Sequence, residues 1–369
     1  CVGSGDPRDL HYPLRRQRQI GIRDRYMNLA LFNRIKAVHD NADQLGLTPV
    51  QRRLTEKYYK RFVRNGALLS AADQDTLKSI NTRLAALQLS FVNNVMSEIA
   101  NNYVVVDNAD RLSGLPKNTI DAAAKLAADK GMAGKWVFTP SASTRLAVLT
   151  SADDRSLRVE MYKTYMATAN RGNEFDNSKN INAILKLRQQ KAKLLGFKTF
   201  ADYAIDPVMA KTVDAAENLL LSIWKPAVKK VDEEVADMQK YADAHGAGYK
   251  IEAWDYYYFA EKVKAEKYNF SEDDVRPYFK LENVVENGLF FLANKLYGLT
   301  FTKMPKAPKY NPEVTVYDVK DAKGKHVAVF MTDYYPRPVK AQGAWMMEMN
   351  QAYDFGGKSE RPIVYNVCS

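Results

Sequence analysis

Histidine and cysteine, the side chains most typical of zinc sites and of nucleophilic catalysis at neutral pH, are few in this sequence. They comprise four histidines and two cysteines, namely His11, His39, His245, His326, Cys1 and Cys368. A zinc-hydrolase helix carries two histidines four residues apart, with a glutamate after the first, so that both rings lie on one face. No two histidines here have that spacing. The sequence therefore predicts no metal ligand and no catalytic residue of its own.

Other catalytic motifs are also missing from the sequence. It contains no P-loop, no G-x-G-x-x-G fingerprint and no G-x-S-x-G nucleophile elbow. Nucleotide binding and serine-hydrolase chemistry are therefore not favoured. His245 is expected just after a helix and His326 at the start of a strand, where both have ordinary structural roles. The two cysteines stand at opposite ends of the chain and do not form a disulfide framework by pattern.

Most of the chain from about Met27 has the periodicity of helices. Ser70 and Asp73 resemble a capping box, and apolar residues then recur at spacings of three and four. These residues are Leu77, Ile80, Leu84, Leu87, Phe91 and Val95. Further helices are expected over 157–169, 181–195, 213–244 and 254–268. Because aromatic runs on helices usually pack in cores, the run 254–259 predicts packing rather than a ligand cage.

Strand patterns are short and lie in two places. Residues 103–106, a tyrosine followed by three β-branched valines, are expected to pair with 136–139. Apolar residues alternate at Val314 and Val316, and again over 327–331, on either side of a glycine-containing turn at 321–325. The second pattern predicts a β-hairpin.

Composition limits the class of protein. The chain has 369 residues, 46% of them hydrophobic, and a net charge of +11, which is enough for a sizeable core and about two domains. No apolar run is long enough to cross a membrane. Positive and negative residues are interleaved without a recognition motif, so nucleic acid is not an expected partner. The compartment, cytoplasmic or periplasmic, is left open.

The first 25 residues differ from the rest. They hold six arginines and no lysine, and they show no apolar periodicity. We interpret this segment as a tail, a tag remnant or a damaged start. The alternative is that Cys1 is the acylated first residue of a lipoprotein.

Four stretches resemble the thimet oligopeptidase family of zinc metallopeptidases, in particular its bacterial peptidyl-dipeptidase, or dipeptidyl carboxypeptidase, branch. They are 31–70, 183–212, 254–301 and 329–346, the last reading VFMTDYYPRPVKAQGAWM. The resemblance covers roughly residues 27–368 in order. It implies a mainly α fold, a helical ellipsoid of the thimet oligopeptidase or neurolysin-like type, with a small β-hairpin or sheet near the C-terminus.

The resemblance also implies zinc-dependent hydrolysis of short, unstructured peptides. In the family, a segment like Asn366, Val367 and Cys368 leads to a His-Glu-Phe-Gly-His helix that binds zinc, which has no counterpart here. We therefore expect an incomplete chain that binds no zinc and is inactive alone, with the C-terminal catalytic half as its missing partner. The expected divisions are an arginine-rich tail (1–26), a helical region (27–310) and a hairpin and edge-strand region (311–369).

The resemblance assigns a substrate-facing edge strand to the C-terminal region. The predicted substrate-binding residues are Gly343, Ala344, Trp345 and Met346, which follow the segment 334–337. Gly343 is expected to allow close backbone approach. The strand run 327–335 should be paired on one side by the hairpin, and its other side is a candidate for peptide addition. Alternatively, these residues are only a packing surface of the hairpin.

Three functional hypotheses remain at this point. The chain is a fragment of a peptidase that removes C-terminal dipeptides, an inactive peptide-binding module, or a fragment of a related oligo-endopeptidase.

Overall fold

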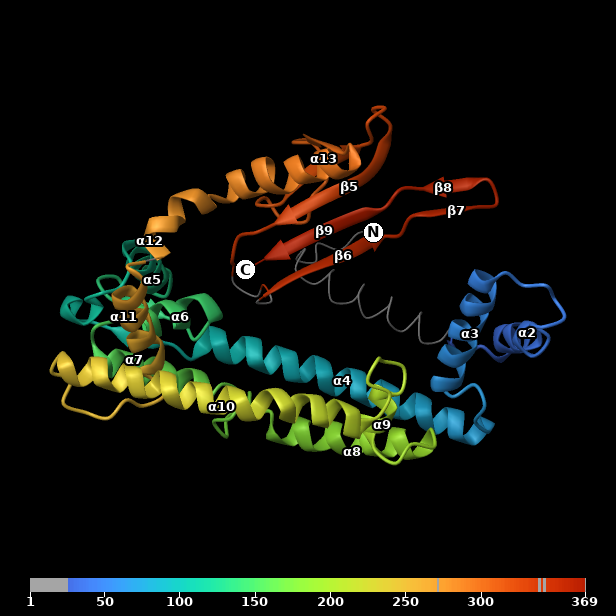
Figure 1. Ribbon diagram of the computed structural model, residues 1–369, viewed down its shortest axis with the longest axis horizontal. Coiled ribbons are helices and arrows are strands. Elements are labelled where there is room, and N and C mark those ends of the chain that lie inside the picture. The colour runs from blue at the N-terminus through green and yellow to red at the C-terminus, as the bar shows by residue number, and fades with distance from the viewer. Residues whose placement is uncertain (1–25, 271, 338–339, 341–342, 369) are drawn as a thin grey trace. The chain divides into compact units, whose positions relative to one another are not determined.

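A computed structural model describes residues 26–270, 272–337, 340 and 343–368 (Figure 1). The predicted tail lies outside this part of the chain except for Tyr26. The chain divides into two compact units: unit 1 is Cys1–Asn94 with Asp176–Pro226, and unit 2 is Val95–Phe175 with Ala227–Ser369. Within the described residues, no helix is long and apolar enough to span a bilayer.

The mainly helical class predicted from the sequence is confirmed. The α-helices are α2 (Leu29–Asp40), α3 (Pro49–Arg64), α4 (Ala71–Asn101), α5 (Lys117–Asp129), α6 (Ala142–Ser151), α7 (Arg155–Met166), α8 (Ser178–Leu194), α9 (Phe200–Ile205), α10 (Val213–Ala244), α11 (Tyr256–Tyr268), α12 (Glu272–Val275) and α13 (Phe291–Tyr297). Two short 3₁₀ turns, η2 (Ala109–Leu112) and η3 (Arg276–Phe279), and a π-helical segment, η4 (Asn283–Phe290), accompany them.

The core of unit 1 forms where α4 packs against α8. The capping pattern read from the sequence is real, because the Ser70 hydroxyl accepts a hydrogen bond from the Asp73 N–H at 3.2 Å. From there the predicted apolar stripe of α4 contributes Ile80 and Leu84, which are buried together with Ile184 and Leu187 of α8. A second cluster joins Phe32 of α2 and Phe62 of α3, and Tyr26 packs edge-on against Phe62.

The helical part of unit 2 is built around a small strand pair. The predicted pairing is confirmed: β1 (Val104–Val106) is antiparallel to β2 (Trp136–Phe138). Apolar side chains of both strands are buried with residues of α5, α6 and α7, including Val148 and Met161. The predicted aromatic packing is also observed, since Phe259 is buried with Met238 and Ala242 of α10.

A buried ion-pair network holds α7 to the start of α11. The carboxylate of Asp255, which is fully buried, accepts hydrogen bonds from Arg155 at 2.8 Å and from Arg158 at 2.9 Å. Arg158 is itself buried and also donates to the main-chain oxygen of Ala152 at 2.7 Å. Burial would raise the pKa of Asp255, but the hydrogen bonds from the two arginines lower it. The charges are therefore compensated, as buried charges must be.

The C-terminal part of unit 2 is a five-stranded sheet in the order β3-β4-β5-β9-β6. Its strands are β3 (Thr300–Lys303), β4 (Thr315–Lys320), β5 (His326–Asp333), β6 (Ala344–Asn350) and β9 (Ile363–Cys368). The predicted hairpin is confirmed as the antiparallel pair β4 and β5. Strand β9 runs parallel to β5 and antiparallel to β6, so β9 lies between two strands that precede it in the chain (Figure 1).

A two-stranded ribbon connects β6 to β9. It consists of β7 (Tyr353–Phe355) and β8 (Lys358–Glu360), with Phe355 paired to Lys358 across Gly356 and Gly357. Both glycines have positive φ, 60° and 75°. A two-residue hairpin turn of the primed type requires this backbone conformation, which other residues adopt only at a cost.

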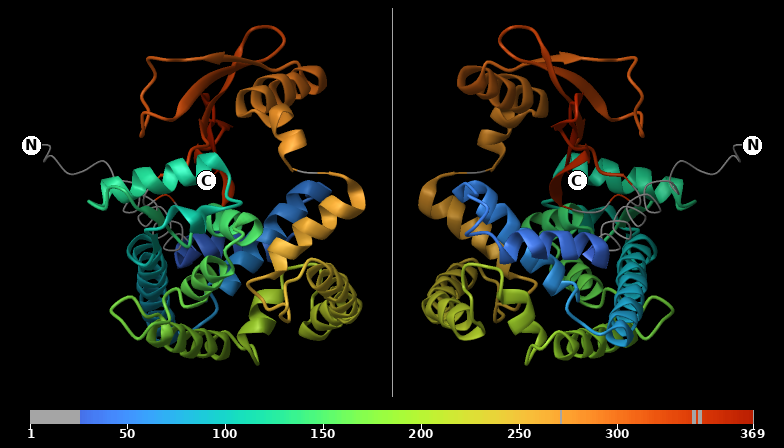
Figure 2. Two further views of the ribbon diagram at one scale, coloured as in Figure 1. Left: turned by 90° about the vertical axis from the view of Figure 1, so that its left-hand side faces the viewer. Right: turned by 90° about the vertical axis from the view of Figure 1, so that its right-hand side faces the viewer.

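Aromatic rings join η4 to the sheet. The ring of Phe290 stacks on Phe301 of β3 with centroids 4.0 Å apart, and Tyr317 and Phe330 complete the cluster. Lys303 adds an ion pair of 2.7 Å to Glu286. Figure 2 shows the helix that ends with α13 lying against these strands. The helix therefore covers one face of the sheet at its β3 end.

Candidate functional site

The histidines within the described residues lie on three separate elements. The ring of His39 on α2 stacks on Tyr59 at 3.9 Å, and that of His245, just after α10, donates to the Tyr241 main-chain oxygen at 2.8 Å. His326 begins β5 and donates to Asp318 at 2.6 Å. The predicted positions of His245 and His326 are correct, and each ring has a local structural partner. His11 lies outside the described residues.

The predicted substrate-binding residues lie at the start of β6, which is an edge strand of the sheet. Gly343 precedes the strand, and Ala344, Trp345 and Met346 are its first three residues. Their partners on β9 are Cys368, Val367 and Asn366 in turn. Because side chains alternate along a strand, Ala344 and Met346 share the exposed face, whereas Trp345 is half-buried on the other. One side of β6 is thus open to main-chain pairing over the described residues.

One detail of the expected edge is corrected. The run 327–335 was expected to offer its second side to a peptide, but that side of β5 is paired with β9. The open side belongs to β6. A Cβ added at Gly343 would meet no described heavy atom within 4 Å, so close approach of a peptide backbone there stays a prediction. Glycine suits this position because its φ is 104°.

A buried polar cluster lies where β5, β6 and β9 meet. At its centre, the Asp333 carboxylate accepts hydrogen bonds from both terminal nitrogens of Arg337, at 2.7 and 2.8 Å, and from the Tyr310 hydroxyl at 2.9 Å. Burial would raise the pKa of Asp333, but hydrogen bonds from Arg337, Lys340 and Tyr310 outweigh it and lower the pKa to about 2. Burial and the bond to Asp333 also raise the pKa of Tyr310. At neutral pH the cluster therefore holds an ionised aspartate and a neutral tyrosine.

The side chain of Lys340 joins this cluster to the end of β9. Its Nζ donates to the Asp333 main-chain oxygen and to Asp333 Oδ1, each at 3.0 Å, and to the main-chain oxygen of Tyr335 at 2.7 Å. It lies 2.6 Å from the main-chain oxygen of Cys368. Only 3% of the Lys340 side chain is exposed. A buried lysine with this many oxygen partners is a fixed structural link between the ends of two strands.

Sequence reasoning named Arg337 but missed Asp333, Lys340 and Tyr310. The sequence shows that Asp333 and Arg337 are only four residues apart, so their contact could have been predicted. The burial of Lys340 could not be predicted in this way, because it depends on the main-chain oxygen of Cys368, 28 residues further along the chain. These three residues hold the loop and the strand ends together.

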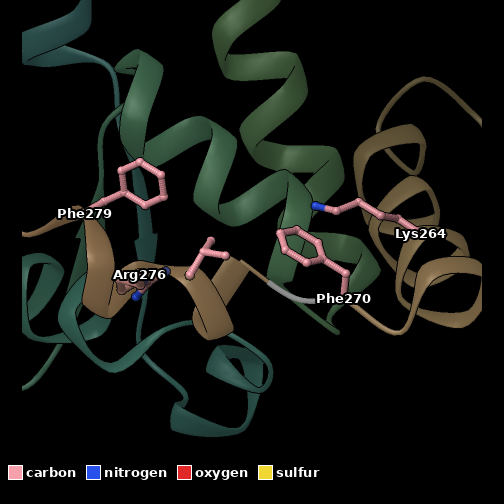
Figure 3. A pocket seen from close by; sticks show the side chains of 5 residues that line it. Lys264, Phe270, Arg276 and Phe279 are labelled. Atoms are coloured by element: carbon pink, nitrogen blue, oxygen red, sulfur yellow. The ribbon is translucent and has the colours of Figure 1, made fainter.

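A separate surface pocket of about 360 Å³ lies in unit 2 beyond the end of α11 (Figure 3). It is lined by Lys264, Phe270, Val275, Arg276 and Phe279. Lys264 contacts Glu261 at 3.1 Å and its amine lies 5.2 Å from the ring of Phe270. Cations beside aromatic rings are held by attraction to the face of the ring. They do not supply the base and nucleophile that hydrolysis needs.

Comparison with known proteins decides the family. Residues 148–369 match Peptidase family M3. The chain belongs to this family. It is 34% identical to a dipeptidyl carboxypeptidase of Salmonella typhimurium and 33% identical to that of Escherichia coli, over 94% of this chain in both cases. It is 28% identical to oligopeptidase A of Salmonella typhimurium over 92% of this chain. The chain spans about half the length of these relatives, 50–51%.

M3 peptidases are zinc-dependent enzymes, and the donors described here do not fit such a site. Catalytic zinc takes three protein ligands, typically histidine and carboxylate, converging within about 2 Å of the ion. Across the described ranges, His, Cys, Asp and Glu side chains nowhere gather in a group able to hold a metal. The buried carboxylate at the end of β5, Asp333, is surrounded by Arg337, Lys340 and the Tyr310 hydroxyl.

Proposed function

We propose that this chain is the peptide-positioning part of a zinc metallopeptidase that hydrolyses short peptides and releases C-terminal dipeptides. In this proposal the open edge of β6, from Gly343 to Met346, receives an extended peptide. The chain by itself holds no zinc and cleaves no peptide. In this proposal the catalytic residues belong to a C-terminal half that lies beyond this chain, which spans about half the length of its M3 relatives.

The observation that carries this proposal is the open, seven-residue edge strand at the end of a sheet. An extended peptide adds to such an edge through main-chain hydrogen bonds, and the alternating side chains then decide preference. The similarity to two dipeptidyl carboxypeptidases supports the dipeptide-releasing reaction. Each main-chain bond contributes only about 0.5–1.5 kcal/mol net, so binding by this edge alone should be weak, with a Kd of roughly 1 mM.

The test is a titration of the full chain with a short unstructured peptide, followed by amide NMR shifts. We expect saturable shifts confined to Gly343–Met346 and neighbouring residues of β6. The matched control is the same peptide N-methylated at alternate residues, which keeps its side chains but loses main-chain donors and should give no saturable shift. Equal shifts with both peptides, or tight binding centred elsewhere, would contradict the proposal.

The proposed lack of zinc is tested separately. Metal analysis of the purified chain after dialysis against micromolar zinc should find well below one zinc per chain, and a quenched fluorescent peptide should not be cleaved. The physical reason is that a stoichiometric site needs converging ligands. About one tightly held zinc per chain, removable only by a chelator, would refute this part of the proposal.

Two alternative functions would use the same open edge of β6. A non-catalytic peptide-binding module would bind the peptide equally well but would not be a part of an active enzyme. A fragment of an oligo-endopeptidase is supported by the 28% identity to oligopeptidase A. Cleavage by the longer enzyme of peptides with a free or an amidated C-terminus would separate the two reactions, because only release of a C-terminal dipeptide needs the free carboxylate.

A further inference from the structure

The connection from β5 to β6 must cross the end of β9. Strands β5 and β9 are parallel, with Asp333 paired to Val367, so both end at the same side of the sheet. Strand β6 starts at that side too, because Ala344 pairs with Cys368. The end of β9 therefore lies between the end of β5 and the start of β6 in the sheet.

Lys340 lies on this crossing and contacts both sides of it. Its ammonium bonds the main-chain oxygen of Asp333 at the end of β5 and that of Cys368 at the end of β9. Its third main-chain partner, Tyr335, belongs to the crossing segment. Asp333 Oδ1 supplies the compensating negative charge at 3.0 Å.

We propose that Lys340 is a positioning residue that holds the beginning of β6 in register beside the end of β9 and so preorganises the open edge for peptide. This inference rests on the proposed function of that edge. Lys340 is almost fully buried and does not itself contact the peptide. It acts through the backbone of 343–346, since a β-edge binds an extended chain only when its donors and acceptors are held in the strand conformation.

The substitution that tests the role is Lys340→Met, which keeps length and apolar volume but removes the charge and all donors. Amide hydrogen exchange of the free chain should become at least tenfold faster over 344–348 and remain unchanged in α4 and α8. In the peptide titration, the Kd should rise at least fivefold, so that shifts at 343–346 no longer saturate at the highest peptide concentration used for wild type.

The matched control is Arg158→Met. Arg158 is likewise a buried cation that bonds an aspartate and a main-chain oxygen, but it lies on α7. If both variants lose peptide binding equally, the effect of Lys340 is loss of stability and the inference is overturned. If Lys340→Met leaves exchange and Kd as in wild type, it is overturned as well.

Two further results keep the test decisive. If circular dichroism shows that Lys340→Met does not fold, Asp333→Asn replaces it as the test. This substitution keeps an acceptor oxygen for Lys340 but removes the negative charge. It should accelerate amide exchange over the same residues, 344–348, to a smaller degree. Wild-type exchange protection over 344–348 without a peptide response would sink the proposed function. In that case, loss of this protection in the variant still establishes Lys340 as the residue that positions β6.

Discussion

Asp333 has the most strongly shifted carboxylate pKa in the cluster at the end of β5. The folded-state pKa is about 2, against an ordinary value of 3.8. A depressed pKa means that the ionised form stabilises the fold. This contribution is complete above the ordinary pKa and is lost as pH falls from about 4 toward 2.

We predict that Asp333→Asn destabilises the chain by on the order of 2 kcal/mol at pH 6 and by much less at pH 2.5. The measurement is urea unfolding of both proteins at the two pH values. Asp129→Asn, an exposed position at the end of α5, serves as the control and should give no such difference. A difference for Asp333→Asn that stays constant between the two pH values would contradict the assignment.

The role of a single residue could be predicted from the sequence where its partners are close to it in the chain. The Ser70–Asp73 cap and the site of His245 follow from neighbours within four residues, and both were correct. The cluster around Asp333 draws on Tyr310, 23 residues earlier, and on the carbonyl of Cys368. Such partners are set by strand pairing, which single-residue patterns do not reveal.

At the scale of elements, the Gly356–Gly357 turn determines how β6 is followed by β9. We predict that Gly356→Ala costs about 1 kcal/mol of stability, because alanine resists a φ of 60°. Hydrogen exchange over 353–360 should accelerate at the same time. Thermal unfolding and exchange mass spectrometry measure the two effects.

Gly288→Ala is the matched control for this turn. Gly288 lies within η4, and an added Cβ would approach only the Asn283 main-chain oxygen, at 4.0 Å. Alanine there should be neutral or mildly stabilising. If Gly356→Ala proved as harmless as Gly288→Ala, the turn would not constrain the ribbon.

Elements with a strong local signal were predicted closely. The bounds 213–244 coincide with α10, and both the β1–β2 pair and the β4–β5 hairpin were anticipated. Strands β3 and β9 were missed. Their pairing is with distant segments, and in β9 all residues except Val367 are only half-buried, so no clear alternation marks the strand. The π-helical bonding of η4 also has no simple sequence pattern.

At the scale of the whole molecule, the first half of α10 exposes a continuous apolar surface. Leu219, Leu220, Ile223 and Trp224 are each 59–67% exposed. Large side chains gathered in this way favour association, because monomeric proteins rarely leave such patches in contact with water.

We predict that the chain associates at micromolar concentration, and that Leu220→Lys combined with Trp224→Lys reduces the association at least tenfold. Sedimentation velocity over a concentration series measures it. Asn218→Lys with Ser222→Lys adds the same charge to exposed polar positions of the same helix and should have a smaller effect. The prediction would be refuted if the wild-type chain were monomeric at every concentration over a 100-fold range.

The central place of β9 also has a consequence for synthesis on the ribosome. When Asp333 has emerged, β5 can pair only with β4, and its other side remains unprotected until residues 363–368 follow. During that interval the nascent chain carries an unpaired strand that can recruit a neighbouring chain. Once β9 pairs with β5 and β6 pairs with β9, both sides of β5 are paired and β6 becomes the free edge of the sheet.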